Sequence, residues 1–168
     1  MDFTLSEEQQ LLKDSVDRFV REEYELDKRR ALADSDEGFS RAHWSMMAEL
    51  GWLGAAMPEQ YGGIGGGPVE IMVLMEGFGK GLVVGPYFPT AVLGGNLVLK
   101  AGSAARKQEM LPKLVAGDLM MAFAYAERQA RYDLFDVEMT GAKDGGGFVL
   151  NGAKGVVGYA ACADWIVV

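Results

Sequence analysis

The 168-residue sequence predicts an α+β fold, with an all-helical domain over residues 1–117 and the first strands of an incomplete β domain over residues 118–168. Up to Ala116, apolar residues recur at intervals of three and four, the spacing that lines one face of a helix. After Gly117 the pattern changes to short apolar or alternating runs separated by glycine-rich turns, which is typical of strands. This change of period places the predicted domain boundary just before Asp118.

The first helix is predicted by its N-terminal cap and by its apolar face. Ser6 and Gln9 have the spacing of a capping box, in which each side chain bonds the backbone N–H of the other residue. Val16 and Phe19 follow at helical spacing, with charged residues on the other face. The pattern predicts one long amphipathic helix that reaches about Arg30.

Prolines and glycines mark the limits of the later helices. A second helix is expected to begin after Ser40 and to end at Gly51, and another to begin at Pro68. The prolines at positions 86 and 89 introduce a nearly uncharged segment, which predicts a helix buried on most sides. Pro112 lacks an N–H and clashes with the preceding turn, so we expect it to split 104–116 into two short helices.

The last third of the chain has the pattern of strands. The run 119–126 is almost continuously apolar, as in a strand buried on both faces. The runs 148–150 and 164–168 and the pair Val156-Val157 continue the β pattern, and Asn151-Gly152 is a strong hairpin signal. A β domain seldom ends on a bare apolar strand, so we expect either a cut relative to a longer protein or a partner that covers the edge, and favour the cut.

Composition and charge exclude several functions. With a net charge of −8 and a pI near 4.7, the chain lacks the basic face that nucleic acids and anionic membranes require. No apolar run approaches the roughly 20 residues of a membrane span, and the N-terminus lacks the regions of a secretory signal, so a cytoplasmic protein is expected. The sole cysteine, Cys162, is expected to be a buried filler, and the sole histidine, His43, has no neighbours suited to a metal site.

Three motifs resemble the acyl-CoA dehydrogenase family in their order and spacing. They are MPEQYGGIG at 57–65, LPKLVAGD at 111–118 and FVLNGAK at 148–154. The resemblance covers essentially the whole chain, and it implies the family's helical N-terminal domain followed by the first strands of its central β-barrel domain. Two further segments, GGGPVE at 65–70 and AYAERQARYD at 124–133, are most similar to the small subunit of pimeloyl-CoA dehydrogenase, a branch linked to dicarboxylyl-CoA oxidation.

The resemblance implies an FAD-dependent oxidoreductase of fatty-acid β-oxidation that desaturates an acyl-CoA thioester. In that chemistry a carboxylate removes the α proton while the β hydrogen leaves as hydride to the flavin. The family's carboxylate lies in a C-terminal helical domain outside this sequence, so no residue here is assigned as catalytic and the chain alone is expected to be inactive. The implied partners are an acyl-CoA, a homo- or hetero-oligomer with a large dehydrogenase subunit, and electron-transfer flavoprotein as electron acceptor.

The resemblance also implies a cofactor site, with several substitutions. Where the family usually has Thr-Glu-Pro-x-Ala-Gly-Ser-Asp, this chain keeps Glu127, Ala130 and Asp133 but has Ala126 for Thr, Arg128 for Pro, Arg131 for Gly and Tyr132 for Ser. Where the family usually has Lys-x-Trp-Ile-Thr, it keeps Lys154 but has Val156 for Trp and Gly158 for Thr. The expected FAD contacts are Phe123, Tyr125, Ala126, Val156 and Gly158, with backbone N–H groups replacing the lost hydroxyls.

The substrate-binding residues expected from the resemblance are Arg128, Arg131, Tyr132, Thr90 and Leu93. The two guanidinium groups could pair with a CoA phosphate, a flavin pyrophosphate or the distal carboxylate of a dicarboxylic acyl chain. Alternatively they are solvated, or they pair with Glu127 or Asp133. Thr90 and Leu93 correspond only loosely to the family's acyl-pocket wall.

Three functions therefore compete. The first is a fragment of an FAD-dependent, small-subunit acyl-CoA dehydrogenase. The second is a scaffold subunit of a heteromeric dehydrogenase that binds no flavin itself, as the lost ring and hydroxyls would allow. The third is a CoA-thioester binding module, which only the two arginines support.

Overall fold

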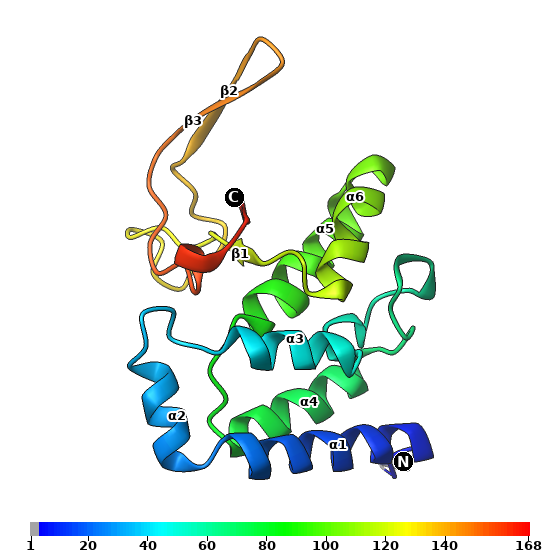
Figure 1. The fold of residues 1–168 in the computed structure, drawn as a ribbon. Helices are drawn as coiled ribbons and strands as arrows, with labels where there is room; N and C mark the ends of the chain where they lie inside the picture. Colours follow the sequence, from blue (N-terminus) through cyan, green and yellow to red (C-terminus); the bar gives the residue numbers. More distant parts are fainter. Residues whose placement is uncertain (1–3) are drawn as a thin grey trace.

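The computed structural model describes residues 4–168, so the start of the N-terminal segment, residues 1–3, lies outside the described part. Helices fill the first two-thirds of this part, and short strands follow (Figure 1). The helical elements are α1 (Glu7–Glu23), α2 (Leu26–Ala33), α3 (Arg41–Glu49), η1 (Trp52–Gly54), η2 (Glu59–Tyr61), α4 (Pro68–Lys80), η3 (Phe88–Gly95), α5 (Asn96–Ala101) and α6 (Ala104–Ala116). The remaining elements are β1 (Met121–Phe123), β2 (Thr140–Asp144), β3 (Gly147–Asn151), the short 3-10 turn η4 (Ala160–Cys162) and β4 (Trp165–Val167).

Helix α1 begins as predicted but ends earlier. The Ser6 hydroxyl accepts from the Gln9 N–H at 3.2 Å, and the Ser6 N–H donates to Gln9 Oε1 at 3.0 Å, which confirms the capping box. The prediction of one helix to Arg30 was wrong, because Tyr24 leaves the helical conformation with φ −119° and ψ 39°. Its ring is buried in the core and its hydroxyl donates to the Val84 carbonyl, so tertiary packing outweighs the local helical pattern.

Helices α3 and α4 have the predicted starts. The Ser40 hydroxyl caps α3 by accepting from the His43 N–H at 3.2 Å, and Gly51 follows with φ 76°, a value that favours glycine. Pro68 is the first residue of α4. Helix α4 packs closely on α1, since a Cβ added at Gly77 would lie only 2.7 Å from Val16 Cγ1.

The uncharged segment after Pro86 is helical and largely buried, as predicted, but it opens as a π-helix, η3, before continuing as α5. Phe88 at its start is exposed, whereas Thr90 and Ala91 are buried. The π-helical geometry has no signal in the sequence pattern. It places the Thr90 side chain against β1, as described below.

The prediction that Pro112 splits the segment 104–116 was wrong. Helix α6 is continuous from Ala104 to Ala116 with Pro112 inside it. Proline removes one N–H···O=C bond of the helix. Met110, Leu111 and Leu114 are all buried on the core side, so packing on both sides of the proline holds the two halves as one helix.

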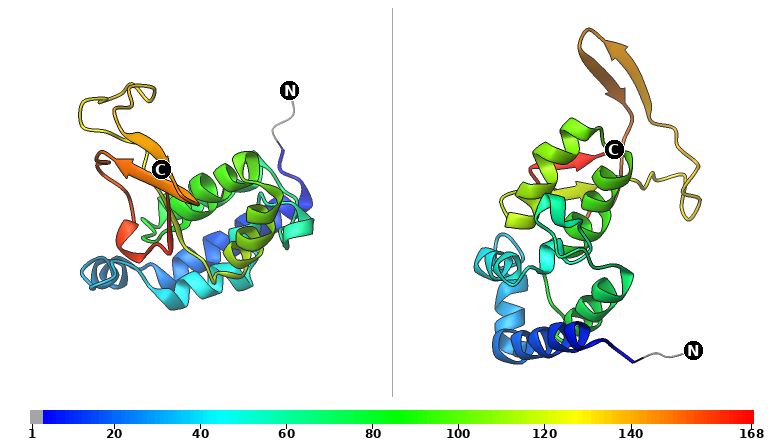
Figure 2. Two further views of the ribbon diagram at one scale, coloured as in Figure 1. Left: turned by 90° about the horizontal axis from the view of Figure 1, so that it is seen from above. Right: turned by 90° about the vertical axis from the view of Figure 1, so that its right-hand side faces the viewer.

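The strands form two separate two-stranded sheets. Strands β1 and β4 pair in parallel, with Met121 opposite Trp165 and Phe123 opposite Val167. Strands β2 and β3 form an antiparallel hairpin that projects away from the helices (Figures 1 and 2). Every residue of β2 and β3 is exposed, so this hairpin packs neither face against the helical core.

Two β predictions were wrong in detail. The hairpin turn lies between Asp144 and Gly147, whereas Asn151-Gly152 closes β3 without a turn into another strand. Val156-Val157 is not a strand, because Val156 has φ 52°, which an extended strand does not permit. The glycine-rich 144–147 segment therefore outweighed the Asn-Gly signal.

Helices followed by strands confirm the predicted fold class. The boundary at residues 117 and 118 stays a prediction, since β1 packs on η3 across it. Within residues 4–168, no helix combines the length and the apolar character needed to cross a membrane.

Candidate functional site

The site is organised around Glu127, which follows β1 and begins the loop that leads to β2. Its Oε1 accepts from Lys154 Nζ at 2.6 Å and from the Met139 N–H at 3.1 Å. Its Oε2 accepts from Gln129 Nε2 and from the Glu138 N–H, both at 2.8 Å. One carboxylate thus joins the start of the loop, the end of the loop and the segment after β3. We call these contacts, with Glu127 and Lys154 at their centre, the neck of the loop.

The neck is shielded from solvent. The Glu127 side chain is 3 % exposed and the Lys154 side chain 10 %, while most of the loop between Glu127 and Met139 is exposed. The Gly155 N–H also donates to the Ala126 carbonyl at 2.9 Å. The segments 125–127 and 154–155 therefore lie side by side, although they are far apart in the sequence.

The contacts of the neck fix the charge of Glu127. The Lys154 ammonium, followed by the Gln129 amide and the Glu138 N–H, lowers the pKa of Glu127 from its ordinary value of 4.5 to about 2. The carboxylate is therefore ionised at neutral pH, and it serves as a fixed acceptor. A general base must take up a proton during the reaction, so this arrangement does not suit that role.

The expected cofactor residues lie on both sides of the neck. The rings of Phe123 and Tyr125 lie 5.3 Å apart at the end of β1. Among residues 4–168, no group accepts a hydrogen bond from the backbone N–H of Tyr125 or Ala126. Val156 is 98 % exposed, and Gly158 is exposed as well. Both segments are thus accessible next to the neck.

The expected substrate residues on the loop point to solvent. Arg128 and Arg131 are exposed, and within the described part of the chain neither makes an ion pair or a hydrogen bond. Glu127 pairs with Lys154, and Asp133 Oδ1 accepts from the Phe135 N–H, so of the two alternatives without a ligand the structure has the solvated arginines. Tyr132 is fully exposed.

Thr90 and Leu93 lie on η3, away from the loop. The Thr90 hydroxyl is completely buried, donates to the Met121 carbonyl at 2.9 Å and accepts from the Met121 N–H at 3.0 Å. This residue therefore ties η3 to β1 and has no surface to offer a ligand. Leu93 is partly buried on the same helix.

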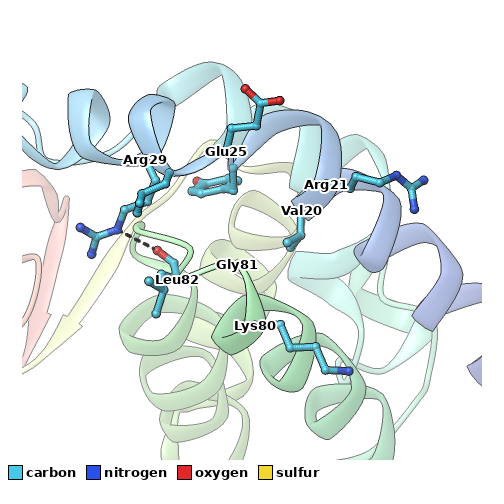
Figure 3. A pocket seen from close by; sticks show the side chains of 9 residues that line it. Val20, Arg21, Glu25, Arg29, Lys80, Gly81 and Leu82 are labelled. Carbon is cyan, nitrogen blue, oxygen red and sulfur yellow. Dashed lines mark hydrogen bonds between the residues drawn. The ribbon is translucent and has the colours of Figure 1, made fainter.

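Of the hollows outside the loop, two are relevant to ligand binding. One, of about 350 Å³, lies where α1, α2 and α4 meet, and Figure 3 shows the charged ends of Arg21, Arg29 and Lys80 pointing away from one another around it. Because these cations diverge, they do not form an anion site. The other, of about 460 Å³, is an apolar groove between α5, α6 and the β1–β4 pair, with Met110, Phe123 and Trp165 among its lining residues.

The lone histidine and cysteine have local contacts only. His43 Nδ1 lies 3.3 Å from the Tyr24 hydroxyl and Nε2 lies 3.3 Å from Glu23. Cys162 is partly buried rather than buried, and burial raises the pKa of its thiol. Within residues 4–168 no three His, Cys, Asp or Glu side chains are grouped to hold a metal.

Sequence reasoning identified Glu127 and Lys154 as matching family residues but not as a pair. Nor did it identify the Gln129 side chain or the N–H groups of Glu138 and Met139 as partners of Glu127. The signal available in the sequence was that one acidic and one basic family position are both kept, one before and one after the hairpin. A pairing across 27 positions cannot be obtained from periodicity.

This chain is similar to known proteins in both sequence and fold. Residues 6–118 match the acyl-CoA dehydrogenase N-terminal domain. The mitochondrial isovaleryl-CoA dehydrogenase of Pongo abelii is 33 % identical over 167 residues, which cover 98 % of this chain and 39 % of that protein. The ChsE4-ChsE5 complex of Mycobacterium tuberculosis contains a chain that superposes with a TM-score of 0.86 at 29 % identity, covering 99 % of this chain and 44 % of the other.

A further similar structure is that of the electron transferring flavoprotein of Acidaminococcus fermentans, with a TM-score of 0.84 at 26 % identity, covering 98 % of this chain and 44 % of that one. The helical elements described above coincide with the matched residues 6–118, so fold and sequence agree on the class of domain. The chain belongs to the acyl-CoA dehydrogenase family. The chain spans about two-fifths of the length of the curated relatives it matches.

Proposed function

We propose that this chain is the N-terminal part of an FAD-dependent acyl-CoA dehydrogenase of the small-subunit type, which acts on a medium-chain or dicarboxylic acyl-CoA such as pimeloyl-CoA. The observation that carries the proposal is the pair of backbone N–H groups at Tyr125 and Ala126, which lie beside the neck and donate to no group within residues 4–168. Family membership gives the reaction class.

The residues present fit one edge of a flavin. Two adjacent N–H donors suit the oxygen and nitrogen acceptors on the pyrimidine side of the isoalloxazine, and backbone donors are unaffected by the replacement of Thr by Ala126. The rings of Phe123 and Tyr125 offer apolar surface beside them. When bound, FAD would supply the hydride acceptor, and this chain's residues would hold and orient it.

The acyl-CoA dehydrogenase function also requires groups that this chain is not assigned. No carboxylate within residues 4–168 is placed as the base that removes the α proton, since the buried Glu127 is held ionised by Lys154. We infer that the 168 residues alone do not desaturate an acyl-CoA. The ChsE4-ChsE5 structure supports a heteromeric assembly, and the electron transferring flavoprotein structure supports such a flavoprotein as acceptor.

Arg128 and Arg131 support the dicarboxylic substrate class. Both guanidinium groups are exposed on the loop without an internal partner, so they are available for a carboxylate or phosphate. Replacing both with Ala is expected to weaken turnover of a dicarboxylyl-CoA more than turnover of a monocarboxylyl-CoA of equal length. Lys143→Ala, on the exposed face of β2, is the matched control. Equal losses for the two substrates would remove the distal-carboxylate assignment.

The scaffold subunit is the second candidate, because Ala126, Val156 and Gly158 offer neither a hydroxyl nor a stacking ring. Counting FAD separates the two. The full-length product is purified with its partner subunit, and bound FAD is measured from the visible flavin spectrum. One FAD per chain supports a flavin site here, whereas half that number supports the scaffold and contradicts the proposal.

A further inference from the structure

We propose that Glu127 and Lys154 are positioning residues that hold the two halves of the cofactor site at a fixed separation. The inference rests on the proposed function, because it concerns the same site. One half is the segment 123–126, which ends at Glu127, and the other is the segment 156–158, which begins just after Lys154. The ion pair at 2.6 Å is the direct side-chain link between these halves.

The rest of the connection cannot set this separation by packing. Between Glu127 and Lys154 the chain runs through the exposed loop and then through the hairpin β2–β3, whose residues are all exposed. A hairpin that buries neither face has no apolar contact to fix its position. The place where the second half begins therefore depends on the polar contacts of the neck.

Those contacts are few and specific. At the start of the second half, Lys154 pairs with Glu127 and the Gly155 N–H donates to the Ala126 carbonyl at 2.9 Å. At its far end, the Tyr159 hydroxyl accepts from the Gly85 N–H at 2.7 Å, and the Tyr159 ring packs edge-on against Phe39 of the core. Residues 156–158 are thus held at both ends. Of the two sets of contacts, only the neck also involves the first half, 123–126.

The geometry requires a charged pair at the neck. Both oxygens of Glu127 are occupied, each by two donors. An amide at this position would turn its NH₂ group toward two of those donors. A neutral side chain at position 154 would leave a shielded carboxylate without its counter-ion, and that loss is far more costly than the loss of an exposed pair.

The test uses the full-length chain with its partner subunit and three variants. Lys154→Met removes the charge and keeps the length, Lys154→Arg keeps the charge, and Lys143→Met removes an exposed lysine of β2 as the control. Two quantities are measured: amide hydrogen exchange at Glu138, Met139 and Gly155, and the Kd for FAD by flavin fluorescence. Circular dichroism checks that the helices are intact.

Lys154→Met is expected to speed exchange at the three amides and to weaken FAD binding by roughly 10- to 100-fold, the range for a lost hydrogen bond to a charged group. Lys154→Arg is expected to stay close to wild type in both measurements, which a loss of packing alone would not produce. Lys143→Met is expected to change neither.

The inference and the proposed function can fail separately. If wild type binds FAD and Lys154→Met binds it equally well, the inference is overturned and the proposed function stands. If wild type binds no FAD, the proposed function fails and exchange alone decides: unchanged protection at Glu138, Met139 and Gly155 in Lys154→Met then overturns the inference, while lost protection supports the neck as a device that holds the two segments.

The pH dependence of the neck gives an independent readout. Because the pKa of Glu127 is lowered to about 2, the ionised carboxylate stabilises the folded neck fully above the ordinary pKa of 4.5. This stabilisation is lost as the pH falls from there toward 2. Lys154 is the charged side chain that contacts Glu127 within residues 4–168. Protection at Glu138 and Met139 is therefore expected to be constant from neutral pH to about 5, and its loss is expected to begin at a higher pH in Lys154→Met. An unchanged onset in that variant would contradict the pairing.

Discussion

The helical part and the β part of this chain are held together by different forces. In the helical part, large side chains such as Trp52, Leu74 and Leu111 are fully buried in one core. In the β part beyond Ala124, Glu127 is the buried residue, and β2 and β3 are exposed throughout. The helical part is an apolar core. Beyond Ala124 the chain is held by hydrogen bonds, by one internal ion pair, and by the partly buried side chains of Tyr159, Cys162 and Val167 that pack against that core.

This difference explains where the family's chemistry can vary. A packed core tolerates few changes of volume. A loop held only at its neck can change its tip without a cost in packing, and this chain has replaced three of the family's loop residues there, at Arg128, Arg131 and Tyr132. Ligand-binding residues are generally found on such loops, which a rigid scaffold holds in place.

The largest expected effect compares the same substitution in the two parts. Leu111→Ala empties a fully buried position in α6 and is expected to cost about 2–5 kcal/mol of unfolding free energy. Leu150→Ala in β3, where the side chain is 54 % exposed, is expected to change it by less than about 0.5 kcal/mol. Urea denaturation followed by circular dichroism measures both. Similar losses in the two variants would show that the hairpin packs against something in solution. The contrast between a packed helical part and an unpacked hairpin would then be wrong.

The next effect concerns the contact that joins the two parts. Thr90→Val keeps the shape of the side chain but leaves the buried N–H and carbonyl of Met121 without this partner, so a loss of about 1–3 kcal/mol is expected. Thr140→Val, at an exposed position of β2, is the control and should be close to neutral. A neutral Thr90→Val with altered acyl-CoA affinity would instead restore the substrate role predicted for this residue.

The same comparison shows which features a sequence can reveal. Several features were predictable because they depend on residues a few positions apart. They are the helix caps at Ser6 and Ser40, the start of α4 at Pro68 and the change of period after Gly117. The break at Tyr24 and the continuity through Pro112 were not. Both depend on the tertiary contacts of these side chains in the core, and local sequence propensity carries no information about such contacts.

For the site, the sequence supplied the residue types but not their arrangement. Glu127 and Lys154 stood out as retained family positions, and the absence of a ring at Val156 was visible from the substitution alone. That the carboxylate would accept from Lys154, and not from Arg128 or Arg131, depends on the path of a 27-residue connection. The solvent-facing orientation of the two arginines follows from that path.

A smaller effect is expected at the second anchor of the β part. Tyr159→Phe removes the acceptor of the Gly85 N–H and is expected to cost about 1 kcal/mol, the usual net value of one hydrogen bond. Tyr132→Phe, at a fully exposed position on the loop, is the matched control and should have no measurable effect. A loss in Tyr159→Phe no larger than in the control would show that the ring of Tyr159, and not its hydroxyl, holds this end of residues 156–158.

The smallest effect on stability is expected where the effect on ligand binding should be largest. Arg128→Ala and Arg131→Ala remove exposed side chains that make no ion pair within residues 4–168, so each should change the unfolding free energy by less than about 0.5 kcal/mol. Because such a variant remains folded, any change in its affinity for CoA thioesters would report ligand contact alone. The affinity is measured by calorimetry on the full-length complex beside Lys143→Ala. If either arginine variant lost more than about 1 kcal/mol of stability, the loop tip would have an internal partner and the contrast between neck and tip would not hold.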